Sequence, residues 1–139
     1  MAQLVRDIMT PDPVAMTADT PVRQAAQAMR DQDIGDVLVV EGDQLSGIVT
    51  DRDLVVRGLA ERDDLSGCTL GEVCTRQPIT ATPDDDADSA IARMRHNAVR
   101  RIPVLDRGRP VGVLSLGDAA IEKDPDSALA DISAAAATT

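Results

Sequence analysis

Two short motifs place a side-chain hydroxyl three residues before a carboxylate. They are Thr50-x-x-Asp53 and Ser115-x-x-Asp118. Where a strand runs into a helix, this spacing forms a capping box, in which hydroxyl and carboxylate each satisfy a free backbone N–H group. The same geometry can bind a ligand, because a helix N-terminus attracts phosphate and a neighbouring carboxylate can accept hydrogen bonds from a ribose diol. Capping alone would account for both motifs, so both interpretations stay open.

A basic pair accompanies the second motif only. Arg100 and Arg101 precede a β-branched run, whereas Gly35 and Asp36 stand at the corresponding positions of the first half. Arginine can bind phosphate bidentately, and a carboxylate repels it. A solvated pair or a salt bridge to an aspartate is the alternative. If a phosphorylated ligand binds, we expect the second motif to be better equipped for it.

Both motifs belong to an internal repeat. Corresponding residues recur 65 positions apart without a gap, as Gly47 and Gly112 do. Further matched pairs are Ile8 with Val73, Met29 with Met94, and Asp53 with Asp118. Chance does not produce such a series along half a chain, so we expect two similarly folded halves.

Each half is predicted to run strand, helix, strand, strand, helix, which makes an α/β (α+β) fold. Thr20 is the expected N-cap of the first helix, before Pro21. The expected elements are strands at 14–16 and 79–81, helices from Thr20 to Met29 and at 87–96, hairpins at 37–50 and 102–115, and closing helices at 51–59 and 116–123. The expected core stripes of the two longer helices are Val22, Ala25, Ala26 and Met29, and Ala87, Ala90, Ile91 and Met94.

The predicted organisation is a first repeat at 1–60, a linker at 61–69, a second repeat at 70–123 and a tail at 124–139. A half of this size buries too little apolar surface to be stable alone. The two repeats should therefore pack together about a pseudo-twofold axis and leave clefts between them. The tail is expected to hold a short helix that ends near Ser133.

The composition excludes several classes of protein. A net charge of −10 argues against a general nucleic-acid binder, which needs a basic face. The chain contains no Phe, Tyr or Trp, so it cannot stack bases on aromatic side chains, and a ring-shaped ligand must lie between aliphatic ones. Neither a membrane-spanning apolar run nor a signal-peptide core is present, so we expect no membrane partner and a cytoplasmic location.

Catalysis and metal binding are not expected. His96 is the only histidine and has no serine or cysteine partner at motif spacing. Cys68 and Cys74 lack zinc-ligand spacing and are interpreted as reduced thiols, with an intermolecular disulfide as the alternative. The acidic run 84–86 should begin a helix, where its charge is favourable, with a magnesium site as the alternative. We expect no enzyme, no metal and no obligatory cofactor.

The runs from Gly47 to Asp53 and from Gly112 to Asp118 resemble the recurring motif of the CBS-domain family, in particular its two-repeat Bateman modules. The helix-to-strand stretch 94–104 is similar to another signature of that family. The resemblance covers about residues 5–122. Within the family, the stretches 29–35 and 50–60 are most similar to the actinobacterial hypoxic response protein group, which implies a role in stress response. Leu38 departs from the pattern, because Pro103 stands at its counterpart.

The resemblance implies a stand-alone regulatory module that binds an adenosine-containing ligand, such as AMP, ADP or ATP, in the cleft between the repeats. Thr50 and Ser115 would contact phosphate or ribose, and Asp53 and Asp118 the ribose hydroxyls. The backbone groups that would read the adenine edge lie near Val14, Met16, Ile79 and Ala81.

The resemblance also implies a homodimer, with 51–59 and 116–123 as its contact helices, and an effector protein of unknown identity. The alternative function is a ligand-free protein–protein interaction or a structural role in stress response. That alternative agrees with the acidic surface and with a purely capping role of the motifs.

Overall fold

A computed structural model of the chain describes residues 3–123 and Ile132. Its elements, in chain order, are α1 (Val5–Ile8), β1 (Thr10–Pro11), β2 (Ala15–Thr17), α2 (Val22–Gln32), β3 (Asp36–Glu41), β4 (Gln44–Thr50), α3 (Asp51–Asp53), the π-helix η1 (Leu54–Leu59), α4 (Leu70–Val73), β5 (Thr75–Arg76), α5 (Ala87–His96), β6 (Arg101–Asp106), β7 (Arg109–Ser115) and α6 (Leu116–Lys123). The tail expected at 124–139, with its helix ending near Ser133, lies outside the described residues apart from Ile132.

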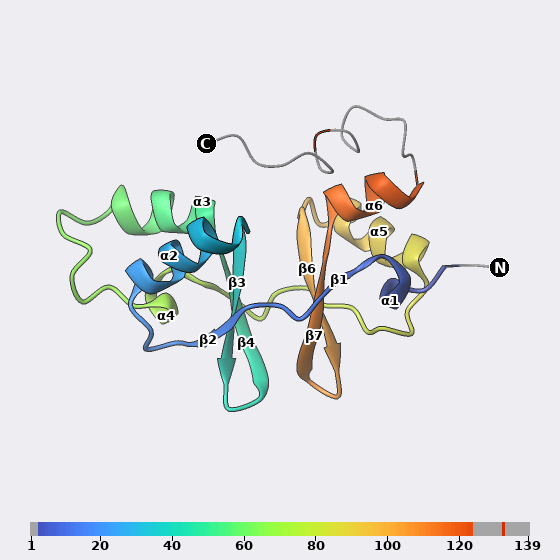
Figure 1. Cartoon of the computed structure of the whole chain (residues 1–139), viewed down its shortest axis with the longest axis horizontal. Helices are drawn as coiled ribbons and strands as arrows, with labels where there is room; N and C mark the ends of the chain where they lie inside the picture. Colours follow the sequence, from blue (N-terminus) through green and yellow to red (C-terminus); the bar gives the residue numbers. More distant parts are fainter. Residues whose placement is uncertain (1–2, 124–131, 133–139) are drawn as a thin grey trace. The chain divides into compact units, whose positions relative to one another are not determined.

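The chain folds into two compact units, each named here after its motif residue. The Thr50 unit comprises Pro13–Pro78 and Gly108–Pro110. The Ser115 unit comprises the described parts of Met1–Asp12, Ile79–Arg107 and Val111–Thr139. Each unit therefore takes its first short helix from the other sequence repeat: α1 belongs to the Ser115 unit and α4 to the Thr50 unit (Figure 1).

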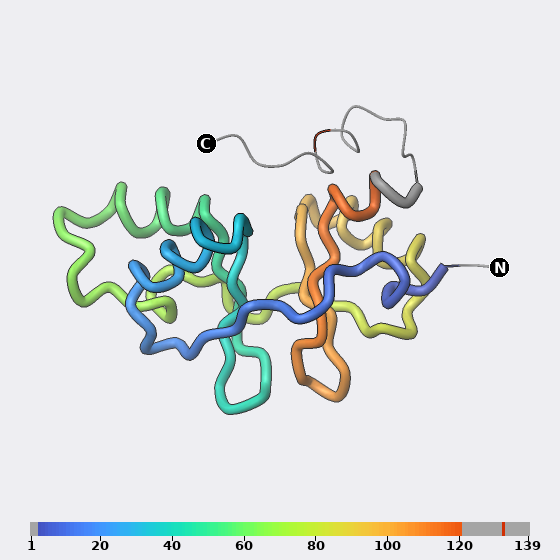
Figure 2. The backbone as a smooth tube through the Cα atoms, in the orientation of Figure 1, coloured from blue at the N-terminus to red at the C-terminus, as the bar shows by residue number. Residues whose placement is uncertain are grey.

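The hairpins are the best-predicted part of each unit. β3 pairs antiparallel with β4, and the strand order is β2-β3-β4-β5 in the Thr50 unit and β1-β7-β6 in the Ser115 unit. Both hairpins close through tight turns that need a left-handed backbone, at Gly42 in one and at Arg107 and Gly108 in the other (Figure 2). The repeat also extends to rare backbone conformations, because Asp33 and its counterpart Ala98 both have positive φ.

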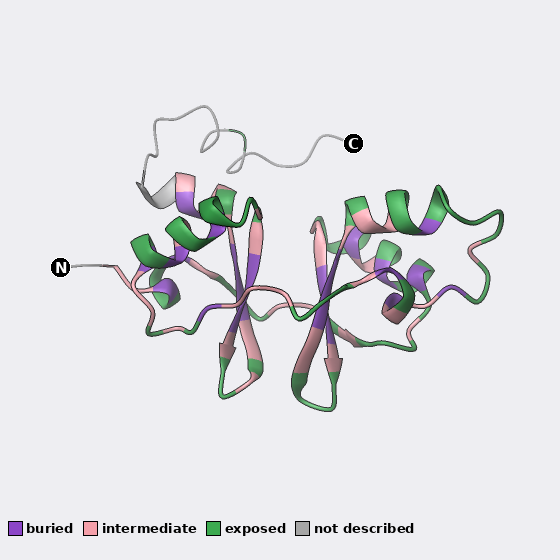
Figure 3. Ribbon diagram, turned by 180° about the vertical axis from the view of Figure 1, so that it is seen from behind, coloured by how far each residue is buried: buried purple, intermediate pink, exposed green. Residues whose placement is uncertain are grey.

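Each unit has its own aliphatic core, between one face of its sheet and its helices (Figure 3). In the Thr50 unit the buried side chains are Val22, Ala25, Met29, Val37, Val39, Val49, Cys68, Leu70 and Val73. In the Ser115 unit they are Val5, Ile8, Ala81, Ala87, Ala90, Met94, Ile102, Val104 and Leu114. The exchanged helices α1 and α4 thus supply core residues to the unit in which they lie.

The predicted strand at 79–81 is wrong, because only Ala81 forms an isolated parallel bridge, with Val104. In the Thr50 unit the corresponding strand is anchored by the Leu38 N–H, which donates to the Val14 carbonyl at 2.9 Å. The counterpart of Leu38 is Pro103, which has no N–H group to donate. The substitution that distinguishes the two halves therefore shortens the strand pairing in the second.

Two details of the predicted α2 are also wrong. Thr20 does not cap the helix: Pro21 occupies the N-cap position without a side-chain hydrogen bond, and the Thr20 hydroxyl lies 3.2 Å from that of Thr17. Ala26, expected in the core stripe, is exposed, whereas Val22, Ala25 and Met29 are buried. In α5, by contrast, the predicted range is confirmed, and the acidic run lies at the start of the helix as expected. Asp86 also caps this helix, because its carboxylate accepts the Ser89 N–H at 3.1 Å.

Asp85 ties the loop before α5 together through its carboxylate. It accepts hydrogen bonds from the N–H and the hydroxyl of Thr82, both at 2.9 Å, and its carboxylate lies 3.1 Å from Arg93. The Thr82 N–H, helped by the Arg93 charge, lowers the pKa of Asp85 below its ordinary value. A carboxyl group whose pKa is lowered by folding stabilises the fold at every pH above its unfolded-state pKa. This contribution is lost as the pH falls through the folded-state pKa.

We expect Asp85→Asn to lower the melting temperature at neutral pH, and the difference from wild type to shrink as the pH falls through the acid range of aspartate. Thermal melts of both proteins across that range measure this effect. Asp106→Asn, at the exposed end of β6, is the matched control. A melting-temperature difference that stays constant with pH would contradict the assigned role of the Asp85 charge.

Candidate functional site

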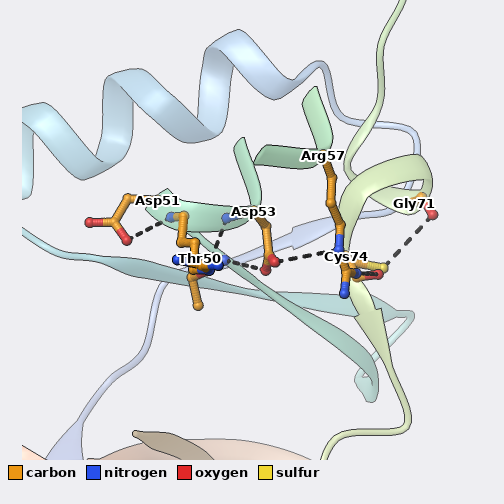
Figure 4. Close-up of polar contacts among 7 residues, drawn as sticks. Thr50, Asp51, Asp53, Arg57, Gly71 and Cys74 are labelled. Atoms are coloured by element: carbon orange, nitrogen blue, oxygen red, sulfur yellow. Dashed lines mark hydrogen bonds and ion pairs between the residues drawn. The ribbon is translucent and has the colours of Figure 1, made fainter. Parts of the chain in front are cut away.

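The first motif lies at the junction of β4 and α3 (Figure 4). The Asp53 N–H donates to the Thr50 hydroxyl at 3.2 Å, and the Thr50 N–H donates to the Asp53 carboxylate at 3.0 Å. This reciprocal pair is a complete capping box. The predicted capping role is therefore confirmed for this motif.

Arg57 adds a cation to the first motif, one turn after Asp53 (Figure 4). Its Nε lies 3.8 Å from Asp53 Oδ1, and its Nη1 donates to the Cys74 carbonyl at 3.3 Å. The Asp53 side chain is only 14% exposed, whereas that of Arg57 is 48% exposed. One carboxylate oxygen of Asp53 thus serves the capping box and the other faces a guanidinium.

The second motif has the same capping box at the junction of β7 and α6. The Asp118 N–H donates to the Ser115 hydroxyl at 2.9 Å, and the Ser115 N–H donates to Asp118 Oδ2 at 3.3 Å. The Thr10 hydroxyl, from the exchanged segment, also donates to Oδ2, at 3.0 Å. Within the described residues no hydrogen bond reaches Asp118 Oδ1, so this oxygen can accept hydroxyl groups of a ligand.

The two motif helices bond their first N–H group in the same way but differ at the second. The Asp51 N–H donates to the Gly35 carbonyl, and the Leu116 N–H to the Arg100 carbonyl. In α3 the next N–H, of Arg52, is held by the Asp51 side chain at 2.8 Å. Leu116 replaces Asp51 in the second half, and in the described chain the Gly117 N–H has no side-chain partner. The start of α6 is therefore the more open of the two.

The basic pair predicted beside the second motif divides into two different side chains. Arg100 is exposed, and its carbonyl lies against the start of α6. Arg101 begins β6, is partly buried and has an interaction of its own, as does Asp36 at its counterpart. Arg100 is thus the exposed member of the pair, and its backbone lies at the start of α6.

The backbone groups predicted to read an adenine edge are partly occupied. The Val14 carbonyl accepts the Leu38 N–H, and Met16 pairs with Val39 in the parallel ladder. Ala81 uses both its N–H and its carbonyl, which bond to Pro103 and Leu105 at 3.0 and 2.8 Å. Ile79 makes no backbone hydrogen bond within the described residues and packs against the core of the Ser115 unit.

Two neighbours of the motif carboxylates were not predicted. Arg57 could have been found, because an arginine four residues after an aspartate on one helix is a recognisable ion-pair spacing. Thr10 could not, because its contact with Asp118 spans 108 positions and depends on the exchange of the first segment.

The metal-ligating side chains of the described residues do not gather into a metal site. No group of three or more His, Cys, Asp or Glu side chains within residues 3–123 is placed to hold a metal ion. Cys68 and Cys74 are free cysteines, and burial raises the pKa of the Cys68 thiol. His96 is exposed at the end of α5. Among the described helices, none is both long and apolar enough to cross a membrane.

Comparison with known proteins agrees with the repeat, the fold and the motifs. The CBS domain family matches residues 5–59 and 70–122. Hypoxic response protein 1 of Mycobacterium tuberculosis is 33% identical over 116 residues, which cover 83% of this chain and 81% of that protein.

Two solved structures of similar proteins contain adenosine compounds. The CBS domain pair of protein MJ0100, in complex with 5′-methylthioadenosine and S-adenosyl-L-methionine, has a TM-score of 0.80 and 26% identity, covering 91% of this chain and 100% of that one. CBSX2 in complex with AMP has a TM-score of 0.74 and 25% identity, covering 87% and 98%. With both of its repeats matched by the family, this chain belongs to the CBS-domain proteins and contains a CBS pair.

Proposed function

We propose that this CBS pair is a regulatory module that binds an adenosine-containing ligand of the AMP, ADP or ATP type through its hydroxyl–carboxylate motifs. The observation that carries the proposal is the uneven use of the Asp118 carboxylate. Within residues 3–123, Oδ2 accepts every hydrogen bond that this carboxylate receives, and Oδ1 is left to accept the hydroxyls of a ribose. The adenosine compounds bound by similar CBS pairs support this ligand class.

The two motifs are proposed to contribute unequally. At the second motif, the open Gly117 N–H and the exposed Arg100 can attract a phosphate group, because both present positive charge near the start of α6. At the first motif, Asp51 already occupies the corresponding N–H, and Arg57 lies beside the carboxylate. We therefore assign the main contact with the ligand to Ser115, Asp118 and Arg100.

Isothermal titration of the intact protein with AMP, ADP, ATP and S-adenosylmethionine tests the proposal. We expect saturable binding of at least one nucleotide, and weaker binding of adenosine than of AMP because adenosine lacks the phosphate. The ligand would bias the conformation of the module, which an effector protein then recognises. Failure of all four compounds to bind would overturn the proposed ligand class.

A ligand-free interaction protein is the second candidate, and one observation favours it. Both capping boxes are complete with protein atoms alone, so each motif has a structural use without any ligand. This candidate predicts that substitutions in the motifs change stability only. The comparison of Asp118 and Asp53 variants in the Discussion separates the two candidates.

We also propose that the protein is a homodimer that uses the apolar face of η1. Val55, Val56 and Leu59 are 56%, 43% and 60% exposed, which is costly for three large apolar side chains on one helix. We expect Leu59→Asp to shift the protein towards monomer, because a carboxylate would be desolvated in such an interface.

Sedimentation velocity at several protein concentrations measures this effect. Gln24→Asp, which adds the same charge at an exposed position of α2, should leave the oligomeric state unchanged. A wild-type protein that remains monomeric at high concentration would refute the dimer.

A further inference from the structure

The Thr50 unit contains a cavity of about 680 Å³ beside α2. This volume is within the usual range of small-molecule sites. One wall is α2, another is the start of η1, and the third is the loop that follows η1. The lining residues that matter here are Val22, Arg23, Ala26, Arg30, Leu54 and Leu65.

The loop wall is folded by two hydrogen bonds of its own and is joined to α2, because the Cys68 carbonyl accepts the Val22 N–H at 3.0 Å. The Asp64 carboxylate accepts the Ser66 N–H at 2.9 Å, and the Leu65 carbonyl accepts the Cys68 N–H at 3.0 Å. Leu65 packs against the core of the unit, and a side chain at Gly58 would meet its methyl group at 3.6 Å. The cavity is therefore bounded by a fixed wall.

Ala26 leaves room that the other repeat fills. Its counterpart in α5, 65 positions later, is Ile91, which packs against the core of the Ser115 unit. In α2 the alanine is exposed and lines the cavity. The departure from the repeat thus replaces a packed aliphatic side chain with space.

Arg23 is a second departure at the same cavity. It lies in the first turn of α2, where the helix dipole disfavours a cation and where no acidic residue is present. Its counterpart in α5 is Asp88, whose charge suits that position. Within residues 3–123 the Arg23 side chain has no hydrogen bond or ion pair, whereas Arg30 is held by Asp31 at 2.8 Å. The stability of α2 does not explain this arginine.

We propose that this cavity is a binding site for an aliphatic monocarboxylate, separate from the nucleotide motifs. The hydrocarbon chain would lie against Val22, Ala26, Leu54 and Leu65, and Arg23 would bind the carboxylate bidentately. Asp64 on the opposite wall disfavours a doubly charged phosphate, because like charges repel.

Octanoate is the probe, and two-dimensional amide NMR of the full chain measures its binding. We expect saturable shifts at Ala26 and Leu65, and at least tenfold weaker binding of octylammonium, which has the same chain and the opposite charge. Ala26→Ile, which copies the other repeat, should abolish octanoate binding, and Arg23→Gln should weaken it about tenfold. Ala92→Ile and Arg95→Gln, at exposed positions of α5, are the matched controls and should bind like wild type.

Three results would overturn the proposal. The first is the absence of any saturable octanoate shift in wild type, and the second is octanoate binding to Ala26→Ile that is as tight as to wild type. The third is conversion of a dimer to a monomer by Ala26→Ile in sedimentation, which would identify a second copy of the chain as the occupant. Thermal melts check that each variant is folded. These outcomes do not depend on whether AMP binds to the nucleotide motifs.

Discussion

Replacing Asp118 by asparagine is expected to weaken AMP binding by tenfold or more, while replacing Asp53 by asparagine has a smaller effect. Hydrogen bonds to a charged group contribute roughly 1.5–3 kcal/mol, and about 1.4 kcal/mol corresponds to a factor of ten in affinity. Asparagine keeps an acceptor for the Ser115 N–H and the Thr10 hydroxyl but removes the negative charge. With its carbonyl oxygen in the place of Oδ2, the asparagine has an amide NH2 group in the place of Oδ1, so the capping box is kept and the acceptor for the ligand hydroxyls is replaced by a donor.

The smaller effect at Asp53 follows from its surroundings. Its Oδ1 faces Arg57 at 3.8 Å, so part of its charge is already compensated within the protein. Calorimetry of AMP with both variants measures the difference, and thermal melts show how much stability each has lost. Equal, small effects on stability with unchanged AMP affinity would favour the ligand-free interaction protein instead.

Arg100→Gln provides an independent check of the same site. It should reduce the affinity for AMP and leave the affinity for adenosine nearly unchanged, because only AMP carries the phosphate. Arg52→Gln, an exposed arginine beside the first motif, is the matched control. If both substitutions reduce AMP binding equally, the assignment of the phosphate to the second motif is wrong.

The local pattern of the sequence predicted the hairpins, α5, α6 and the capping boxes, because these depend on residues close together in the chain. β-branched runs on both sides of turn residues define β3–β4 and β6–β7. The hydroxyl–carboxylate spacing defines the boxes at Thr50 and Ser115. The closing helix of the first half was also predicted, although it continues from α3 as a π-helix, with the Ala60 N–H bonded to the Val55 carbonyl.

The exchange of the first segments could not be predicted in the same way. α1 and α4 are four-residue helices with similar apolar faces, and nothing in such a short pattern specifies which half buries them. The Thr10 contact with Asp118 was missed for this reason. The error at 79–81 has a different origin. Pro103 is visible in the sequence as a difference between the repeats, but the pairing that it removes is that of the neighbouring segment 79–81 and not that of β6.

Replacing either motif glycine by valine is expected to destabilise its unit by about 1–3 kcal/mol, the usual cost of forcing atoms into a filled space. In the Ser115 unit, a Cβ at Gly112 would lie 2.9 Å from the Thr10 carbonyl oxygen and 2.6 Å from the Met9 sulfur. In the Thr50 unit, a Cβ at Gly47 would lie 2.8 Å from the Thr75 carbonyl oxygen. Both clashes involve backbone, which cannot rotate away as a side-chain end can.

Urea unfolding of Gly112→Val and Gly47→Val measures the cost. The controls are Asp106→Val and Glu41→Val, at the exposed ends of β6 and β3 in the same hairpins, which should change stability little. If Gly112→Val is as stable as its control, β1 does not pair with β7 at this glycine.

The glycine prediction also gives a physical reason for the first residue of each motif. Pro11 pairs with Gly112, and Arg76 pairs with Gly47, so each glycine lies where the exchanged segment of the other repeat joins the sheet. The hydroxyl and carboxylate follow three and six residues later, at the start of the helix. If valine displaces β1, the Thr10 hydroxyl leaves Asp118, and Gly112→Val should weaken AMP binding as well as the fold. Gly47→Val, in the other unit, should weaken the fold with a smaller effect on AMP.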